Sequence, residues 1–92
     1  MRIISQDGTI DVPYEMSAIR NDDKLIILCM AGETGKGSVI ATYSTSEKAE
    51  KAMEMLRDKY KDYAKATNKS NFFTMFDYPK VFQFPQDEDV EV

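Results

Sequence analysis

An unbroken apolar run from Leu25 to Ala31 constrains the fold of this 92-residue chain more than any other segment. A strand with one solvated face alternates apolar and polar residues, and this run does not alternate. Turn residues precede it at 21–23, and a glycine-rich stretch follows it at 32–37. The run is therefore predicted to be a central strand that is at least partly covered on both faces.

The segments around this run favour further strands. Residues 2–5 and 9–14 are predicted to pair across Asp7-Gly8, a dipeptide that favours a two-residue hairpin with positive φ at both central positions. Pro13 lacks a backbone donor, so the second strand lies at a sheet edge or ends there. Further strand patterns occur at 17–20, 38–43 and 80–84. We expect one small, meandering antiparallel sheet of about five to six strands.

One amphipathic helix is the clearest element of the sequence. Its apolar positions recur at spacings of three and four, which places them on one face: Ala49, Ala52, Met53, Leu56, Tyr60, Tyr63 and Ala64. Ser44 and Glu47 have the spacing of a capping box, with Thr45 or Ser46 as alternative caps. The helix is expected to end near residues 67–68. The predicted fold class is α+β, with this helix packed on a face of the sheet.

The excess of acid lies at the end of the chain. The formal net charge is −4, from 12 basic and 16 acidic residues. Asp87, Glu88, Asp89 and Glu91 follow one another without a base, so residues 1–86 carry equal numbers of both signs. We predict a single α+β domain over 1–85 and an acidic flexible tail over 86–92. The tail is either a solvated end or an acidic contact for a basic partner.

Several classes of function are disfavoured by composition. The chain has no histidine, which excludes catalytic triads and metal sites that use it. Its single cysteine, Cys29, excludes an intramolecular disulfide and fits a reducing compartment. No apolar run approaches the roughly 18 residues of a membrane span, and residues 1–7 lack a signal-peptide core. We expect a cytoplasmic protein that is not an enzyme, uses no cofactor or metal and binds no membrane.

The glycine-rich stretch is the first candidate for a binding site. Gly32 and Gly37 have the spacing of glycines in a phosphate-binding loop, but the lysine of that motif is absent and a strand follows instead of a helix. A flexible hairpin connection is the plainer interpretation. In the functional interpretation, phosphate is contacted by Lys36 and Arg20, with support from Thr34 and Ser38.

The aromatic residues between 72 and 84 are the second candidate. Phe82 and Phe84 share one strand face, which is either core beneath the helix or an exposed apolar face for self-association or a partner. The stretch before them is irregular. There Phe73, Phe76 and Tyr78 are candidates for stacking on a base, and Lys69 and Lys80 are further candidates for holding a phosphate.

Three segments resemble a family of short proteins from phages and mobile elements of Gram-positive bacteria. They are the opening MRIISQDGTIDVPYE at 1–15, the helix region ATYST through AMEMLR at 41–57, and FQFP at 82–85 with its acidic end. The family has no assigned activity or site that carries over to this chain. The resemblance implies a cytosolic accessory protein that counters host defence, which is an analogy of context.

The function expected first is non-catalytic counter-defence, in which the protein acts as a sponge for a cyclic or ADP-ribose-type nucleotide immune signal. Such a thin domain is expected to form a homo-oligomer, because pockets can form between subunits. The alternative is an inhibitor or adaptor that binds a host defence protein through exposed aromatics and the acidic tail. A structural phage protein and a nucleic-acid binder, the latter resting on basic residues at 57–69, are weaker hypotheses, and nucleic acid is not an expected partner.

Overall fold

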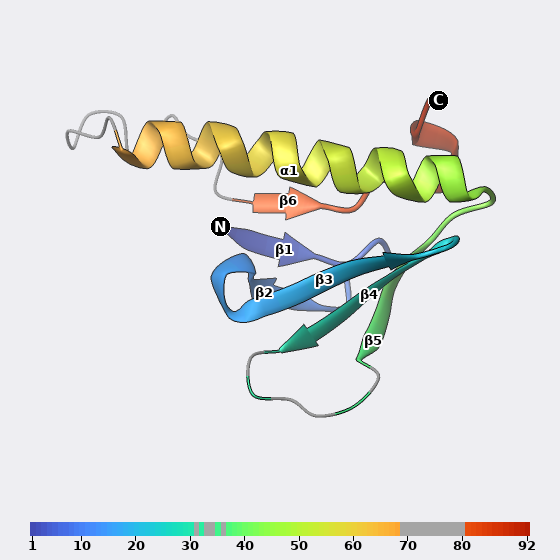
Figure 1. Ribbon diagram of the computed structural model, residues 1–92, viewed down its shortest axis with the longest axis horizontal. Helices are drawn as coiled ribbons and strands as arrows, with labels where there is room; N and C mark the ends of the chain where they lie inside the picture. Colours follow the sequence, from blue (N-terminus) through green and yellow to red (C-terminus); the bar gives the residue numbers. More distant parts are fainter. Residues whose placement is uncertain (31, 33–34, 36, 69–80) are drawn as a thin grey trace.

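A computed structural model describes residues 1–30, 32, 35, 37–68 and 81–92, with side chains in the helix described up to residue 64. This part of the chain forms one α-helix, six strands and two short 3-10 helices (Figure 1). The elements are β1 (Arg2–Ile4), β2 (Asp11–Pro13), η1 (Tyr14–Met16), β3 (Ser17–Asp22), β4 (Leu25–Met30), β5 (Ser38–Thr42), α1 (Ser46–Asn68), β6 (Val81–Gln83) and η3 (Asp87–Asp89). The α+β class with a single helix is confirmed for the described residues.

The strands form two sheets where one was expected. One sheet has the order β2-β1-β6 and the other β3-β4-β5. The 3-10 helix η1 follows Pro13 directly, so the chain leaves the first sheet and begins the second. The β1–β6 pairing is parallel, whereas an all-antiparallel arrangement was expected. β1 and β6 lie far apart in the sequence, with four strands and α1 between them, so no tight turn forces them to be antiparallel.

The apolar run forms the central strand that its sequence predicts. β4 lies between β3 and β5, and Ile26 and Leu28 face the core. Ile27 faces the opposite side and is only 8 % exposed. A register shift between Ile26 and Ile27 makes room for an extra residue in β5, so that Ile40 and Ala41 are both buried.

The turn at Asp7-Gly8 is longer than a two-residue hairpin. Only Gly8 of the pair has a positive φ, 79°. Asp7 instead organises the turn as an acceptor: its Oδ1 receives hydrogen bonds from Ser5 Oγ at 2.7 Å, Thr9 N at 3.0 Å and Thr9 Oγ1 at 2.7 Å. Side chains of this type that bond to nearby backbone stabilise turns without requiring positive φ.

We expect Asp7→Asn to reduce the loss of stability at acid pH. Hydrogen bonds from the Thr9 and Ser5 side chains lower the pKa of Asp7 from 3.8 to about 2. The folded pKa lies below the unfolded one, so this contribution is present above pH 3.8 and is lost as the pH falls through about 2. Thermal unfolding between pH 5 and pH 2 measures it (roughly the range over which such carboxylates titrate). Equal losses in the two proteins over this range would contradict the assignment.

The helix covers the core with the stripe that its spacing predicts. Thr45, one of the alternative caps, accepts a hydrogen bond at Oγ1 from the backbone of Lys48 at 3.2 Å. Ala49, Ala52 and Leu56 are buried in one cluster with residues of both sheets. Phe82 and Phe84 lie in that cluster, with ring centroids 5.1 Å apart and an edge-to-face angle of 87°. Of the two interpretations of these phenylalanines, the core interpretation is the one observed.

The segment 86–92 is held by the fold and is not the flexible tail expected. Val90 is 3 % exposed and belongs to the core cluster. Asp87 accepts hydrogen bonds from Ser44 N at 2.8 Å and, through its backbone carbonyl, from Lys48 Nζ at 2.9 Å. The Ser44 contact is the main cause of the lowered pKa of Asp87. The charge pattern of 86–92 does not predict this packing, because the packing depends on the burial of Val90 and on the hydrogen bonds that Asp87 accepts.

No helix in the described residues is both long enough and apolar enough to cross a membrane.

Candidate functional site

The structure describes two of the nine residues that the sequence indicates as a binding site. Arg20 lies in β3 and Ser38 begins β5. The other candidates lie outside the described residues: Thr34, Lys36, Lys69, Phe73, Phe76, Tyr78 and Lys80. Their roles stay predictions.

Arg20 and Ser38 do not lie on the same face of their sheet. Arg20 pairs with Ile27, which pairs in turn with Val39. Ser38 pairs with Leu28, one position further along β4. Successive residues of a strand point to opposite faces, so Ser38 shares the core-side face of Leu28 and Arg20 shares the outer face of Ile27. These two side chains therefore cannot hold one phosphate together.

Gly37 has a structural reason to be glycine. Its φ is +81°, and a Cβ atom at this position would lie 2.6 Å from both Cys29 Sγ and the Leu28 carbonyl oxygen. A Cβ at Gly32 or Gly35 would meet no atom of the described residues within 4 Å. Close packing against β4 thus explains Gly37 without a phosphate.

We expect Gly37→Ala to destabilise the protein more than Gly32→Ala. Both positions have positive φ, which costs a non-glycine residue about 1–3 kcal/mol. Only Gly37 adds a clash with backbone, so the difference between the variants isolates the steric part. Chemical denaturation of the two variants measures this difference in stability. Equal denaturation midpoints would show that β4 shifts without a cost in free energy to accommodate the added methyl group.

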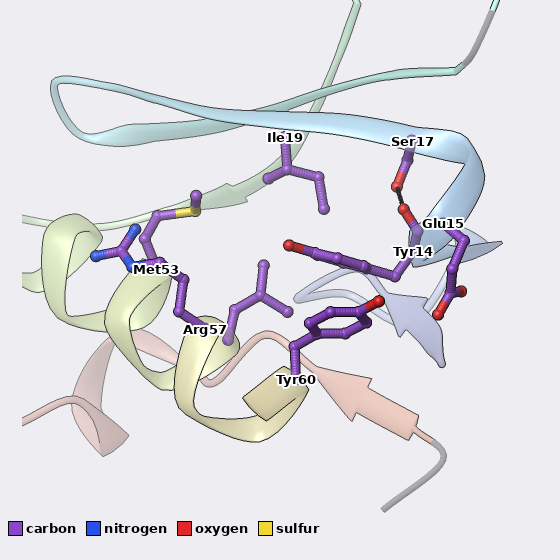
Figure 2. A pocket seen from close by; sticks show the side chains of 8 residues that line it. Tyr14, Glu15, Ser17, Ile19, Met53, Arg57 and Tyr60 are labelled. Carbon is purple, nitrogen blue, oxygen red and sulfur yellow. Dashed lines mark hydrogen bonds between the residues drawn. The ribbon is translucent and has the colours of Figure 1, made fainter. Parts of the chain in front are cut away.

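A cavity of about 490 Å³ lies between α1 on one side and η1 and β3 on the other (Figure 2). We call it the tyrosine pocket. Its lining residues are Tyr14, Glu15, Ser17, Ile19, Met53, Leu56, Arg57 and Tyr60. Leu56 is buried in the core, so this residue anchors the helix side of the pocket to the rest of the fold.

Two tyrosine rings form the aromatic part of this pocket. The rings of Tyr14 and Tyr60 have centroids 4.5 Å apart and an interplanar angle of 31°. Tyr63 extends the group, 5.8 Å from Tyr60. Tyr14 is fixed by the 3-10 helix, and its carbonyl accepts a hydrogen bond from Ser17 Oγ at 2.9 Å. Tyr14 and Tyr60 are both half-buried, so they combine packing with a partly accessible aromatic surface.

The charged groups lie at opposite ends of the tyrosine pocket, as Figure 2 shows for Arg57 and Glu15. Both oxygens of the Glu15 carboxylate accept a hydrogen bond from the amino group of Met1 at 3.0 Å. Among the described residues none forms an ion pair with the exposed Arg57. The negative charge of Glu15 is thus balanced by the Met1 amino group, whereas the positive charge of Arg57 is not balanced by an ion pair among the described residues. This difference favours binding of an anion in the pocket.

The arrangement suits binding of a planar ligand with an acidic group. Tyrosine rings stack on flat π systems, and a guanidinium holds a phosphate or carboxylate with two parallel hydrogen bonds. As for metals, no three acidic or cysteine side chains of the described residues gather closely enough to hold an ion.

Sequence reasoning missed this pocket for a physical reason. The sequence pattern places Tyr60 on the apolar stripe of the helix and Tyr14 at the end of the strand predicted over 9–14. Arg57 was counted only among the basic residues of 57–69. The sequence contains one sign of the pocket. The apolar stripe of the helix carries a tyrosine at position 60, and Arg57 lies three positions earlier on the same side of the helix. Only the packing of η1 against α1 brings Tyr14 to that position.

Comparison of the chain with models of protein families, with curated proteins and with solved structures found no match. Function is therefore inferred from the residues of the chain itself.

Proposed function

We propose that this protein is a non-catalytic binding protein that sequesters a small nucleotide in the tyrosine pocket. The observation that carries the proposal is one cavity of about 490 Å³ that combines the Tyr14 and Tyr60 rings with Arg57. Cavities of roughly 300–1,000 Å³ are typical of small-molecule sites. The protein would bind the nucleotide without changing it.

Each part of a nucleotide has a matching group in the pocket. The base stacks on the tyrosine rings, and the phosphate pairs with Arg57 at one end. Glu15 lies at the other end. A carboxylate offers about four lone-pair sites, and the Met1 amino group uses two of them. Ribose hydroxyls can donate to the rest, which favours an ADP-ribose-type ligand over a ligand without hydroxyls.

The wider role proposed is counter-defence of the kind found in phages, with a cyclic or ADP-ribose-type immune signal as the sequestered nucleotide. It is supported by the resemblance at 1–15, 41–57 and 82–85, which is an analogy of context. Sequestration requires binding without turnover, and a pocket that offers aromatic rings and one guanidinium supports binding of this kind. The cytoplasm is the proposed location, because such a signal is made there.

Arg57→Gln is expected to weaken binding of ADP-ribose by about ten- to 140-fold, because a hydrogen bond to a charged group contributes roughly 1.5–3 kcal/mol. Isothermal titration calorimetry with ADP-ribose measures this. The melting temperature should be unchanged, since Arg57 is exposed.

Lys61→Gln is the matched control, because it removes the same charge from the same helix outside the lining of the pocket. Adenosine, which lacks phosphate, should bind the wild type and Arg57→Gln equally. If Arg57→Gln and Lys61→Gln lower the affinity for ADP-ribose equally, the effect comes from the overall charge of the protein. Arg57 would then not be a residue of the binding site.

A homo-oligomer is proposed as the working form, because the single domain offers little concavity beyond such open pockets. Native mass spectrometry of protein purified from a bacterial host reports subunit number and any retained small molecule together. If the protein is a monomer and binds ADP-ribose, the sequestration proposal stands and the oligomer proposal is wrong.

The alternative proposal is a protein inhibitor or adaptor that binds a host defence protein. It is favoured by Glu88, Asp89 and Glu91, which remain exposed while Asp87 and Val90 are held by the fold. Deleting 86–92 would remove a core residue, so the test neutralises the three exposed acids instead. Loss of a protein partner with retained ADP-ribose affinity would favour this alternative.

A further inference from the structure

A second concave surface lies on the other flank of the helix, where α1 runs beside β6 (Figure 1). It measures about 460 Å³ and is lined by Met55, Asp58, Lys59, Asp62, Val81, Phe82 and Gln83. We call it the β6 groove. None of its residues lines the tyrosine pocket, so the two surfaces are separate.

The floor of the β6 groove is a sheet edge. Among the described residues β6 pairs with β1 and with no other strand. Phe84 donates its backbone N–H to Ile4 O at 3.1 Å, toward β1. Because the backbone groups of successive strand residues point to opposite edges, those of Val81 and Gln83 face away from β1. An edge of this kind is a template for an added strand.

The side chains of the groove define the residues that an added strand would carry. Phe82 points into the core toward the helix, whereas Val81, 38 % exposed, and Gln83 point to the opposite face. A residue beside Phe82 would lie against Met55 and below Asp58 and Asp62. A lysine or arginine fits there, because its stem covers apolar surface while its charge reaches a carboxylate. A residue beside Val81 would be apolar and β-branched.

We propose that the β6 groove binds an extended basic segment of another protein, which adds a strand to the β2-β1-β6 sheet and alternates basic with β-branched residues. Among the described residues that line the groove, the acids exceed the base: Asp58 and Asp62 stand beside one Lys59, and no ion pair joins Lys59 to either acid. A second copy of this chain is a poorer occupant, since a twofold contact would place the same acids against one another.

The test uses a seven-residue peptide of alternating valine and lysine, acetylated and amidated, with the valine–glutamate peptide as its counterpart. The basic peptide is expected to bind and the acidic one not. Asp58→Asn with Asp62→Asn should weaken binding about two- to 25-fold, the range for two exposed charge pairs. Glu50→Gln with Glu54→Gln removes the same charge from the same helix outside the groove and should leave affinity unchanged. Lys59→Gln should raise affinity.

Amide chemical shifts locate the contact independently of affinity. Shifts at Val81 and Gln83, lost when the peptide backbone is N-methylated at alternate residues, are the result expected for an added strand. Absence of binding at millimolar peptide, equal affinity for both peptides, or equal effects of the two double variants would overturn the proposal. Self-association that is strengthened by Asp58→Asn with Asp62→Asn, without peptide binding, would overturn it in favour of a second copy.

Discussion

Phe84→Ala is expected to lower the free energy of unfolding by about 3–5 kcal/mol, the usual effect of removing a buried phenylalanine. Phe84 is 1 % exposed and contacts Phe82 edge-to-face beneath the helix. A small domain has a total stability of roughly 5–15 kcal/mol, so this single change removes a large part of it. Urea denaturation followed by circular dichroism measures the difference.

Two further variants make the result specific to the core. Phe84→Leu keeps most of the buried volume and should cost less than Phe84→Ala. Val92→Ala alters a side chain that is 78 % exposed and should change stability by less than about 0.5 kcal/mol. A loss below about 1 kcal/mol for Phe84→Ala would mean that Phe84 lies outside a packed core.

Tyr60→Leu is expected to weaken binding of ADP-ribose about five- to 140-fold, because stacking of a base on an aromatic ring contributes roughly 1–3 kcal/mol. Leucine keeps an apolar side chain against the core but offers no flat face. Isothermal titration calorimetry at constant salt concentration measures the affinity, and thermal unfolding checks that the fold is retained.

Tyr60→Phe separates stacking from the hydroxyl group. It keeps the ring and should retain most of the affinity. If Tyr60→Phe and Tyr60→Leu weaken binding equally, the hydroxyl group acts and the stacking account is wrong. If neither variant changes the affinity, the ligand does not occupy the tyrosine pocket.

Local sequence patterns predicted the elements in which the spacing of apolar residues shows which side chains are buried. The run 25–31 predicted β4, and the helical spacing from Ala49 predicted the face of α1 that covers the core. Both patterns report directly on which side chains avoid water, so tertiary structure did not override them. The core role of Phe82 and Phe84 was one of two alternatives, and only the position of α1 decides between them.

The features that depend on distant contacts were not predictable in this way. The division into two sheets follows from η1, a short 3-10 helix that the sequence of 14–16 does not signal. Val90 enters the core from a segment whose charges indicate a loose tail. The tyrosine pocket is formed where η1 and β3 pack against α1. No local sequence pattern in these elements predicts that they come into contact.

The most direct test of the central claim is a titration of the isotope-labelled protein with ADP-ribose, followed through amide and aromatic chemical shifts. The account predicts saturable shifts at Tyr14, Ser17, Arg57 and Tyr60, with little change in β6. Shifts confined to other parts of the chain, or none at millimolar ADP-ribose, would contradict nucleotide binding in the tyrosine pocket.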